Sequence, residues 1–281
     1  GVDFYLAFSP ERIDPGNSRF PVRDIPKLVG GINEASTHRA LDFYSRVFSK
    51  VVPLASAREA EMAKLLENTY RAVNIGLVNE LAVLAHQMGV NIWNVIEAAA
   101  TKPFGFTPFY PGPGWGGHCI PVDPVYLSWK AKANGGETGF IDHAVLINSR
   151  MPNYVVQRVA DLLNERGLPL KGARVLLIGV AYKRDVADTR ESPAITILSL
   201  LQQKGALVSY HDPYVDSIGH TGACASVPLT EDLLAAQDCV VITTDHSCID
   251  YDAVARHSRL VFDTRNATKG LKGRHEHVHV L

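Results

Sequence analysis

Short apolar runs alternate with a helical pattern over residues 1–54. Strands are predicted at Phe4–Phe8, Lys27–Gly31 and Val51–Leu54. Between the last two runs, Ala35–Ser49 carries apolar residues at helical spacing, with Asn33 or Ser36 as a candidate cap. This alternation predicts α/β structure. No G-x-G-x-x-G sequence precedes it, so the segment reads as α/β material without the usual beginning of a dinucleotide-binding unit.

A different pattern holds from Ser56 to Gly89, where no proline occurs. Apolar residues recur there at helical spacing, at Met62, Leu65, Leu66, Tyr70, Val73, Leu77, Leu81 and Leu84. Since apolar residues occupy more than one face, this long helix is predicted to join domains or to line a two-fold dimer interface. Further helices are predicted at Ile92–Ala100 with Asn91 as cap, at Val125–Asn134 and at Asp142–Arg166. Residues Lys102–Pro124, dense in Gly, Pro and aromatic residues, are predicted to form a loop.

From about Leu170 the chain alternates strands and helices again. A buried strand is predicted at Ala173–Gly179, and further strands are predicted at Leu207–Tyr210, Cys239–Thr243 and Leu260–Asp263. Helices are predicted at Ser192–Lys204, Glu231–Ala236 and Tyr251–His257. Such alternation predicts a parallel sheet in a doubly wound domain. The fold class is therefore α/β, with residues 1–54 ahead of a helical central domain at 55–168 and a doubly wound domain at 169–281.

Charge and composition narrow the classes of ligand. Of 281 residues, 46% are hydrophobic, which is enough for real cores, and the formal net charge is -1. Without an overall basic field, neither nucleic acid nor an anionic membrane surface is expected as a partner. No apolar run has the length that spans a bilayer. An anionic ligand would be held by a few well-placed cations.

The cysteines indicate the redox compartment of the protein, and the first residues indicate where in a domain the chain begins. The cysteines are Cys119, Cys224, Cys239 and Cys248, and no two form a C-x-x-C pair. This pattern favours a reducing cytoplasm over a disulfide framework. The opening GVDFYLAFSPER has no initiator Met and reads as the middle of a domain, so a preceding segment is expected.

The strongest chemical signal is the segment Gly114–Cys119 (GWGGHC), followed by Asp123. Glycines allow positive φ and close approach of the backbone to a ligand, and their free N–H groups can hold phosphate or sugar oxygens. A cysteine just ahead of a helix can have its thiolate stabilised by the helix N-terminus. The alternative is a buried structural cysteine beside a packing loop.

Two weaker signals lie earlier in the chain. Lys64 and Asn68 share one helix face, where a cation and an amide can stabilise an oxyanion or hold a water, although most such pairs are simply solvated. Glu11 follows a strand, where open α/β sheets place ligand sites, although an ordinary exposed carboxylate is the simpler interpretation.

Polar residues also gather near predicted strand ends in the last domain. The small-residue turn Gly179–Ala181 precedes a helix N-terminus, an arrangement that suits a phosphate, and Lys183 and Arg190 would supply charge. Arg265 follows the last predicted strand at the same sheet edge. At the tail, His275, His277 and His279 could bind a metal, but a disordered or exposed terminal segment is the favoured interpretation.

These motifs together resemble the UDP-glucose/UDP-mannuronate dehydrogenases, and among them the UDP-N-acetylhexosamine 6-dehydrogenases. The motifs are SPER (9–12), EMAKLLENTYRAVNI (61–75), FYPGPGWGGHCIPVDP (109–124), GVAYK (179–183), DTRESPA (188–194) and DTRN (263–266). They span nearly the whole chain in the order of the family. The resemblance implies that residues 1–54 are the end of an NAD-binding domain, 55–168 a helical dimerising domain, and 169–281 a Rossmann-like UDP-binding domain.

The resemblance also implies roles for particular residues in an NAD-dependent, four-electron oxidation of a sugar CH2OH to a carboxylate. Cys119 would be the covalent nucleophile, Lys64 and Asn68 would stabilise oxyanions, Asp123 would order a water, and Glu11 would be the general base of thioester hydrolysis. The expected substrate contacts are Tyr110, Gly114, Gly116, Gly117, Lys183 and Arg265, and the expected cofactor contact is Arg190. A homodimer that binds a UDP-sugar and NAD is expected, with no metal.

Two departures from the family pattern leave alternatives open. Relatives acting on UDP-glucose often carry an arginine sixteen or seventeen residues before the cysteine, where this chain has Lys102. The cofactor fingerprint is also missing from the chain. Besides a UDP-N-acetylhexosamine dehydrogenase, the alternatives are a UDP-glucose 6-dehydrogenase, or a chain that only binds UDP and self-associates.

Overall fold

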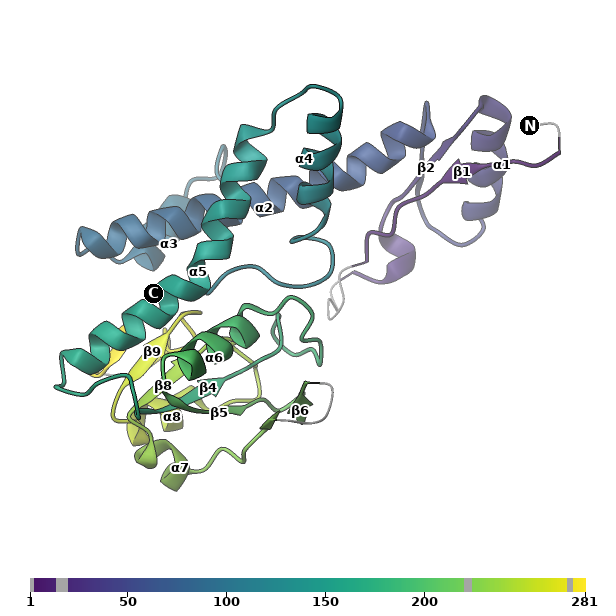
Figure 1. The fold of residues 1–281 in the computed structure, drawn as a ribbon. Helices are drawn as coiled ribbons and strands as arrows, with labels where there is room; N and C mark the ends of the chain where they lie inside the picture. Colours follow the sequence, from purple (N-terminus) through teal and green to yellow (C-terminus); the bar gives the residue numbers. More distant parts are fainter. Residues whose placement is uncertain (1–2, 14–19, 220–223, 272–274) are drawn as a thin grey trace. The chain divides into compact units, whose positions relative to one another are not determined.

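The computed structural model describes residues 3–13, 20–219, 224–271 and 275–281. It divides into two compact units, Gly1–Arg71 and Ala72–Leu281, and each is described by itself. The boundary falls within the long helix α2 (Ala57–Gln87), which is drawn in blue in Figure 1. Its length confirms the helix predicted from the proline-free stretch.

The first unit contains a small sheet with one helix packed on it. The strands β1 (Ala7–Phe8), β2 (Lys27–Gly31) and β3 (Val51–Leu54) lie in the order β1-β2-β3, with β1 antiparallel and β3 parallel to β2. The helices are the 3-10 turn η1 (Val22–Asp24) and α1 (Glu34–Tyr44). The side chain of Asn33 accepts a hydrogen bond from the Ser36 amide and caps α1, as predicted.

Two elements of this unit are shorter than predicted. The first strand shrinks from Phe4–Phe8 to β1, because only Gly30 and Gly31 pair with it. The helix α1 ends at Tyr44 rather than Ser49, because the Arg46 and Val47 amides bond to the Phe43 and Tyr44 carbonyls three residues back and tighten the last turn. Its neighbour β2 is buried along its whole length.

The second unit begins with a layer of helices. After α2 come α3 (Ile92–Ala100), α4 (Asp123–Ala133) and α5 (Gly139–Asn164). The Asn91 side chain caps α3 by accepting from the Trp93 and Asn94 amides, as predicted. The helices α2 and α5 cross closely at Gly76, where an added Cβ would lie 3.1 Å from the Cα of Ala144. The helix α4 starts two residues earlier than predicted, with Pro124 in its first turn.

A five-stranded parallel sheet forms the rest of the second unit. Its strands are β4 (Arg174–Ile178), β5 (Leu207–His211), β8 (Cys239–Ile242), β9 (Val261–Asp263) and β10 (Val278–Val280), in the order β10-β9-β8-β4-β5. The remaining elements are α6 (Pro193–Gln203), α7 (Glu231–Ala236), α8 (Tyr251–His257) and the short antiparallel pair β6 (Ser217–Ile218) and β7 (Cys224–Ala225).

Alternate residues of the inner strand β4 enter two separate cores. Val175 and Leu177 pack in a core with residues of α5 and α6, while Leu176 and Ile178 pack with Leu234 of α7 and Val254 of α8. Both faces of the sheet are therefore covered by helices, as a parallel sheet requires (Figure 1). The predicted fold class, a helical central domain followed by a doubly wound Rossmann-like domain, is confirmed.

The prediction of an exposed or disordered tail is wrong. Residues 278–280 add β10 as an edge strand to β9, and the Leu281 amide bonds to the Asp263 carbonyl at 3.0 Å. The indole of Trp93 donates to the Leu281 carbonyl at 2.8 Å, and His277 Nε2 lies 2.7 Å from the Ala255 carbonyl. Sequence alone did not show this, because the partners lie far away in the chain.

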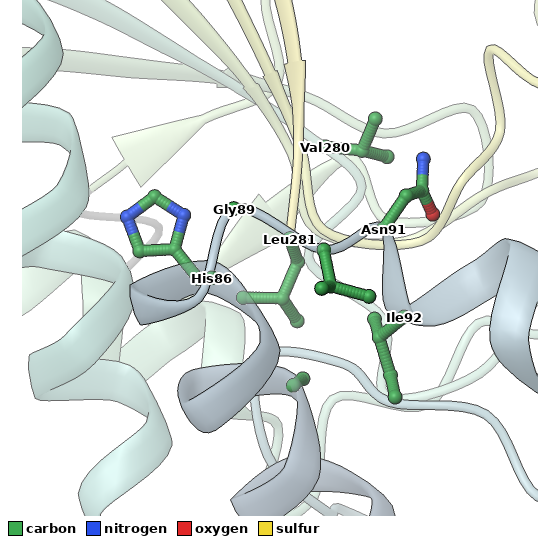
Figure 2. A pocket seen from close by; sticks show the side chains of 8 residues that line it. His86, Gly89, Asn91, Ile92, Val280 and Leu281 are labelled. Atoms are coloured by element: carbon green, nitrogen blue, oxygen red, sulfur yellow. The ribbon is translucent and has the colours of Figure 1, made fainter.

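The tail also closes one wall of a small cavity of about 210 Å³. Figure 2 shows its lining, which comes from the end of α2 (His86), the turn at Gly89, the start of α3 and the last two residues. Within the described ranges, no group of three or more His, Cys, Asp or Glu residues is placed to hold a metal ion. No helix in those ranges is long and apolar enough to cross a membrane.

Candidate functional site

Cys119 lies in the turn that leads into α4. Its carbonyl accepts hydrogen bonds from the amides of Val122 (3.1 Å) and Asp123 (2.8 Å), and the thiol is partly exposed. The Sγ atom is 3.8 Å from Nδ1 of His118, and Cys119 is among the groups that raise the pKa of the nearby Arg190. The interpretation of Cys119 as a fully buried structural cysteine is therefore not supported.

The glycines of the cysteine loop, which we define as residues 109–122, allow close contact with the last domain. Gly114 and Gly117 have φ values of +130° and +91°, which side chains rarely adopt. A Cβ on Gly116 would lie 2.7 Å from the Cβ of Tyr182. The Gly117 amide donates to the Arg190 carbonyl at 3.0 Å. The structure thus gives these glycines a packing role, and substrate contact by them stays a prediction.

Tyr110, near the start of the same loop, is held against α3. Its ring stacks on Trp93 with centroids 5.9 Å apart, and its hydroxyl lies 3.2 Å from the Glu97 carboxylate. Burial, together with the negative charge of Glu97, raises the pKa of Tyr110. The hydroxyl therefore remains protonated and donates to Glu97, while part of the ring stays exposed.

Arg265 lies at the carboxyl edge of the sheet, in contact with the cysteine loop. Its Nε donates to the Thr243 carbonyl at 3.0 Å, and its amide donates to the Asp263 carboxylate at 2.9 Å. Burial lowers the pKa of Arg265, and Asp245 and Asp263 act in the opposite direction. A Cβ on Gly112 would lie only 2.7 Å from Nη1 of Arg265. Lys183, half-buried, follows β4 at the same edge.

Arg190 presents an exposed guanidinium at the start of α6. Its Nε and Nη2 bond to both carboxylate oxygens of Asp188, at 2.6–3.1 Å, and this interaction raises the pKa of Arg190. At the N-cap of α6, the Ser192 hydroxyl is buried and has no hydrogen-bond partner among the described residues. The helix N-terminus thus retains unused hydrogen-bonding capacity beside the cysteine loop.

Sequence reasoning missed a buried pair, Asp212 and His246, that supports this edge. Asp212 Oδ2 accepts from the amides of Val180 (2.7 Å) and Ala181 (2.9 Å) and lies 3.1 Å from His246 Nε2. His246 Nδ1 accepts from the Asp185 amide at 3.0 Å, so the ring proton is on Nε2. Burial alone would raise the pKa of Asp212, but these donors outweigh it and lower the pKa. The one available signal in the sequence was an aspartate shortly after the predicted strand Leu207–Tyr210.

Backbone strain also concentrates at this edge. Among the described residues other than glycine, positive φ occurs at Asp185 (57°), Glu191 (50°) and Asn266 (54°). Each lies within two residues of one of the predicted site cations Lys183, Arg190 and Arg265. Such strain persists where the surrounding structure enforces it, which is common at functional sites.

The first unit holds the remaining predicted residues. Glu11 accepts from the amides of Arg12 (2.7 Å) and Ile13 (2.9 Å) and lies 3.3 Å from the Lys27 ammonium. Burial raises the pKa of Glu11, but these donors and Lys27 together lower it below the usual value. Lys64 is half-buried and Asn68 is buried on α2. These residues belong to the first unit, whereas Cys119 and Asp123 belong to the second, and their meeting in one site stays a prediction.

Comparison with known proteins assigns two domains of the chain. Residues 58–150 match the UDP-glucose/GDP-mannose dehydrogenase family, central domain, and residues 176–270 match the UDP binding domain of the same family. A UDP-N-acetyl-D-mannosamine dehydrogenase of Methanococcus maripaludis is 35% identical over 272 residues, covering 93% of this chain and 60% of the relative. A UDP-N-acetyl-D-glucosamine 6-dehydrogenase of Salmonella typhi is 32% identical over 249 residues, covering 87% of this chain and 57% of the relative.

A solved structure agrees with these matches. The UDP-D-ManNAc dehydrogenase of Pyrococcus horikoshii superposes with a TM-score of 0.86 at 32% identity, over 100% of this chain and 65% of that one. The chain therefore spans about three fifths of the length of the relatives that it matches. The matched domains, the shared fold and the cysteine loop together place the chain in the UDP-glucose/GDP-mannose dehydrogenase family.

Proposed function

We propose that the protein containing this chain is an NAD-dependent UDP-N-acetylhexosamine 6-dehydrogenase that oxidises the C6 hydroxymethyl group to a carboxylate. The observation that carries the proposal is the cysteine loop, which presents the partly exposed thiol of Cys119 while contacting Arg265 and Tyr182 at the edge of the UDP-binding sheet. A nucleotide held at this edge would bring its sugar toward the thiol. Such biosynthetic chemistry, with reduced cysteines, fits the cytoplasm.

The residues of the chain divide the chemistry between them. When bound, NAD takes up the hydride that is lost in each of two oxidations at C6. The Cys119 thiolate adds to the aldehyde from the first oxidation and holds it as a thiohemiacetal. The second oxidation leaves a thioester on Cys119, and water cleaves it to the carboxylate and the free thiol.

Polar residues stabilise the charges that arise along this path. Lys64 and Asn68 stabilise the oxyanions that develop at C6, and Asp123 orders a water near it. Glu11 takes the proton of the attacking water during thioester hydrolysis. Glu11 is a carboxylate at neutral pH, as a base must be, and its lowered pKa makes it a weaker base than an ordinary glutamate. Lys183 and Arg265 neutralise the diphosphate of the substrate.

The chain fits NAD only in part. Arg190 offers an exposed guanidinium beside the cysteine loop that can reach a phosphate of the cofactor. The sequence, however, contains no G-x-G-x-x-G fingerprint ahead of a βαβ unit. We propose that residues 1–54 complete an NAD-binding domain of the longer protein, with 55–168 as the dimerising domain and 169–281 as the UDP-binding domain.

A panel of UDP-sugars tests the proposal directly. NADH formation by the full-length protein should be fastest with a UDP-N-acetylhexosamine, at two NADH per sugar. A preference for UDP-glucose would support the alternative UDP-glucose 6-dehydrogenase. The absence of NADH with every sugar, together with intact UDP binding, would favour the alternative of a binding and dimerisation module.

The UDP site is expected to be present in the 281-residue chain itself. Arg265→Gln should weaken UDP binding by about tenfold or more, because it removes a charge-assisted contact to phosphate. Calorimetric titration measures this, and Lys204→Gln, an exposed lysine beyond the end of α6, is the control. NAD should bind the chain weakly. Equal UDP affinity in the Arg265 variant and the wild type would remove Arg265 from the site.

The chain is also expected to form a homodimer through α2. Leu77, Leu81 and Leu84 are 51%, 39% and 48% exposed on this helix. A groove of about 680 Å³ lies between α2 and α5. It is lined by Leu77 together with Ile147 and the 85% exposed Phe140. A symmetric partner helix would cover this apolar surface.

Leu77→Glu should therefore weaken self-association by about tenfold or more, since a buried unpaired carboxylate is costly. Sedimentation equilibrium over a range of concentrations measures the change. Val95→Glu, at an exposed apolar position on α3 outside the groove, should leave association unchanged. A wild-type chain that sediments as a monomer would refute the dimer.

A further inference from the structure

Two buried asparagines connect the helical layer to the cysteine loop. Asn79 on α2 and Asn148 on α5 are 0% and 1% exposed. Asn79 Nδ2 donates to Asn148 Oδ1 at 2.8 Å, and Asn148 Nδ2 donates to the Ala144 carbonyl at 2.8 Å. On its other side, Asn79 Oδ1 accepts from the Gly112 amide at 2.9 Å. A chain of hydrogen bonds thus runs from α5 through α2 to the loop.

The close crossing of the helices makes this arrangement possible. A Cβ on Gly76 would lie 3.2 Å from Asn148 Nδ2, so the glycine lets α5 approach α2 with the amide between them. Burying two amides among helices is costly unless each is hydrogen-bonded. An apolar pair would pack the two helices equally well, but it could not hold the Gly112 amide. The loop is therefore the element that this polar pair serves.

Gly112 also contacts the residue proposed to bind UDP. The position of its missing Cβ lies 2.7 Å from Nη1 and 3.2 Å from Cζ of Arg265, so the guanidinium packs against the glycine backbone. The other side of Arg265 is held by the Thr243 carbonyl. Asn79 thus contacts Gly112, and Gly112 contacts Arg265. The loop that Asn79 holds continues to Cys119.

We propose that Asn79, supported by Asn148, is a positioning residue that holds the cysteine loop against Arg265, so that the nucleotide-binding arginine and the nucleophile keep one arrangement. The inference concerning UDP rests on the proposed function, whereas the holding of the loop does not. Asn79 acts through the Gly112 amide and takes no part in the chemistry.

Hydrogen exchange and UDP titration of the 281-residue chain test this role. In Asn79→Ala, amide exchange of the loop peptide containing Gly112 should accelerate about three- to tenfold, the equivalent of one lost hydrogen bond. The UDP dissociation constant should rise by a similar factor. Asn153→Ala, an exposed asparagine on α5, is the matched control and should change neither quantity.

Asn79→Asp separates positioning from general stability. Burial favours the protonated acid, which has the shape of the amide and offers a carbonyl to Gly112 and an O–H to Asn148. The melting temperature of this variant should fall as the pH rises. At low pH its loop exchange and its UDP affinity should stay within about twofold of the wild type. If Asn79→Ala does not fold, Asn79→Ser, which is too short to reach Gly112, replaces it.

Each outcome decides the inference. Unchanged loop exchange in Asn79→Ala or Asn79→Ser would overturn it. It would also be overturned if the loop exchange rates of all variants followed only their melting temperatures, whether or not residue 79 offers an acceptor to the Gly112 amide. Faster exchange with unchanged UDP affinity would overturn the coupling to Arg265. If the wild type does not bind UDP, the proposed nucleotide site fails, and the exchange measurements still decide whether Asn79 holds the loop.

Discussion

Cys119→Ser in the full-length protein is expected to lower the rate of sugar oxidation by about three orders of magnitude or more, with substrate affinity changed by no more than a few fold. A serine hydroxyl stays protonated at neutral pH, so it cannot trap the aldehyde as the thiolate does. The surroundings of Cys119 support this role, because its thiol is partly exposed and its Sγ lies 3.8 Å from His118 Nδ1. Stopped-flow measurement of NADH, with calorimetry for the substrate, gives both quantities.

The other cysteines provide matched controls for this experiment. Burial raises the pKa of Cys239 to about 12, which keeps it an unreactive thiol within a strand. Cys224 and Cys248 lie outside the cysteine loop, and their serine variants should retain nearly full activity. Wild-type turnover in Cys119→Ser would remove Cys119 from the mechanism.

Lys64→Ala is expected to lower kcat by about two to three orders of magnitude, the effect of removing one oxyanion-stabilising group, with little change in KM. The charge of Lys64 would meet an oxyanion that exists only along the reaction path. Steady-state kinetics of the full-length protein, with Lys50→Ala at an exposed site as control, measures the effect. A variant with raised KM and unchanged kcat would show that Lys64 binds the ground state instead.

Local sequence was sufficient for most elements of this chain. The proline-free stretch predicted α2, the cap Asn91 marked the start of α3, and the apolar run before Gly179 marked β4. These signals are local because the helical period, a capping side chain and a buried strand each depend on residues only a few positions apart. The same locality made the cysteine loop recognisable, since its glycines and cysteine are contiguous.

Tertiary structure decided the features whose partners lie far away in the chain. The terminal residues became β10 because β9 had a free edge and Trp93, 188 positions away, bonds to Leu281. Asp212 and His246 are 34 positions apart, and Asn79 and Asn148 are 69 apart. No pattern in the sequence pairs such polar residues. A buried amide or carboxylate is stable only with a hydrogen-bond partner, and which residue supplies that partner depends on how the helices and strands pack.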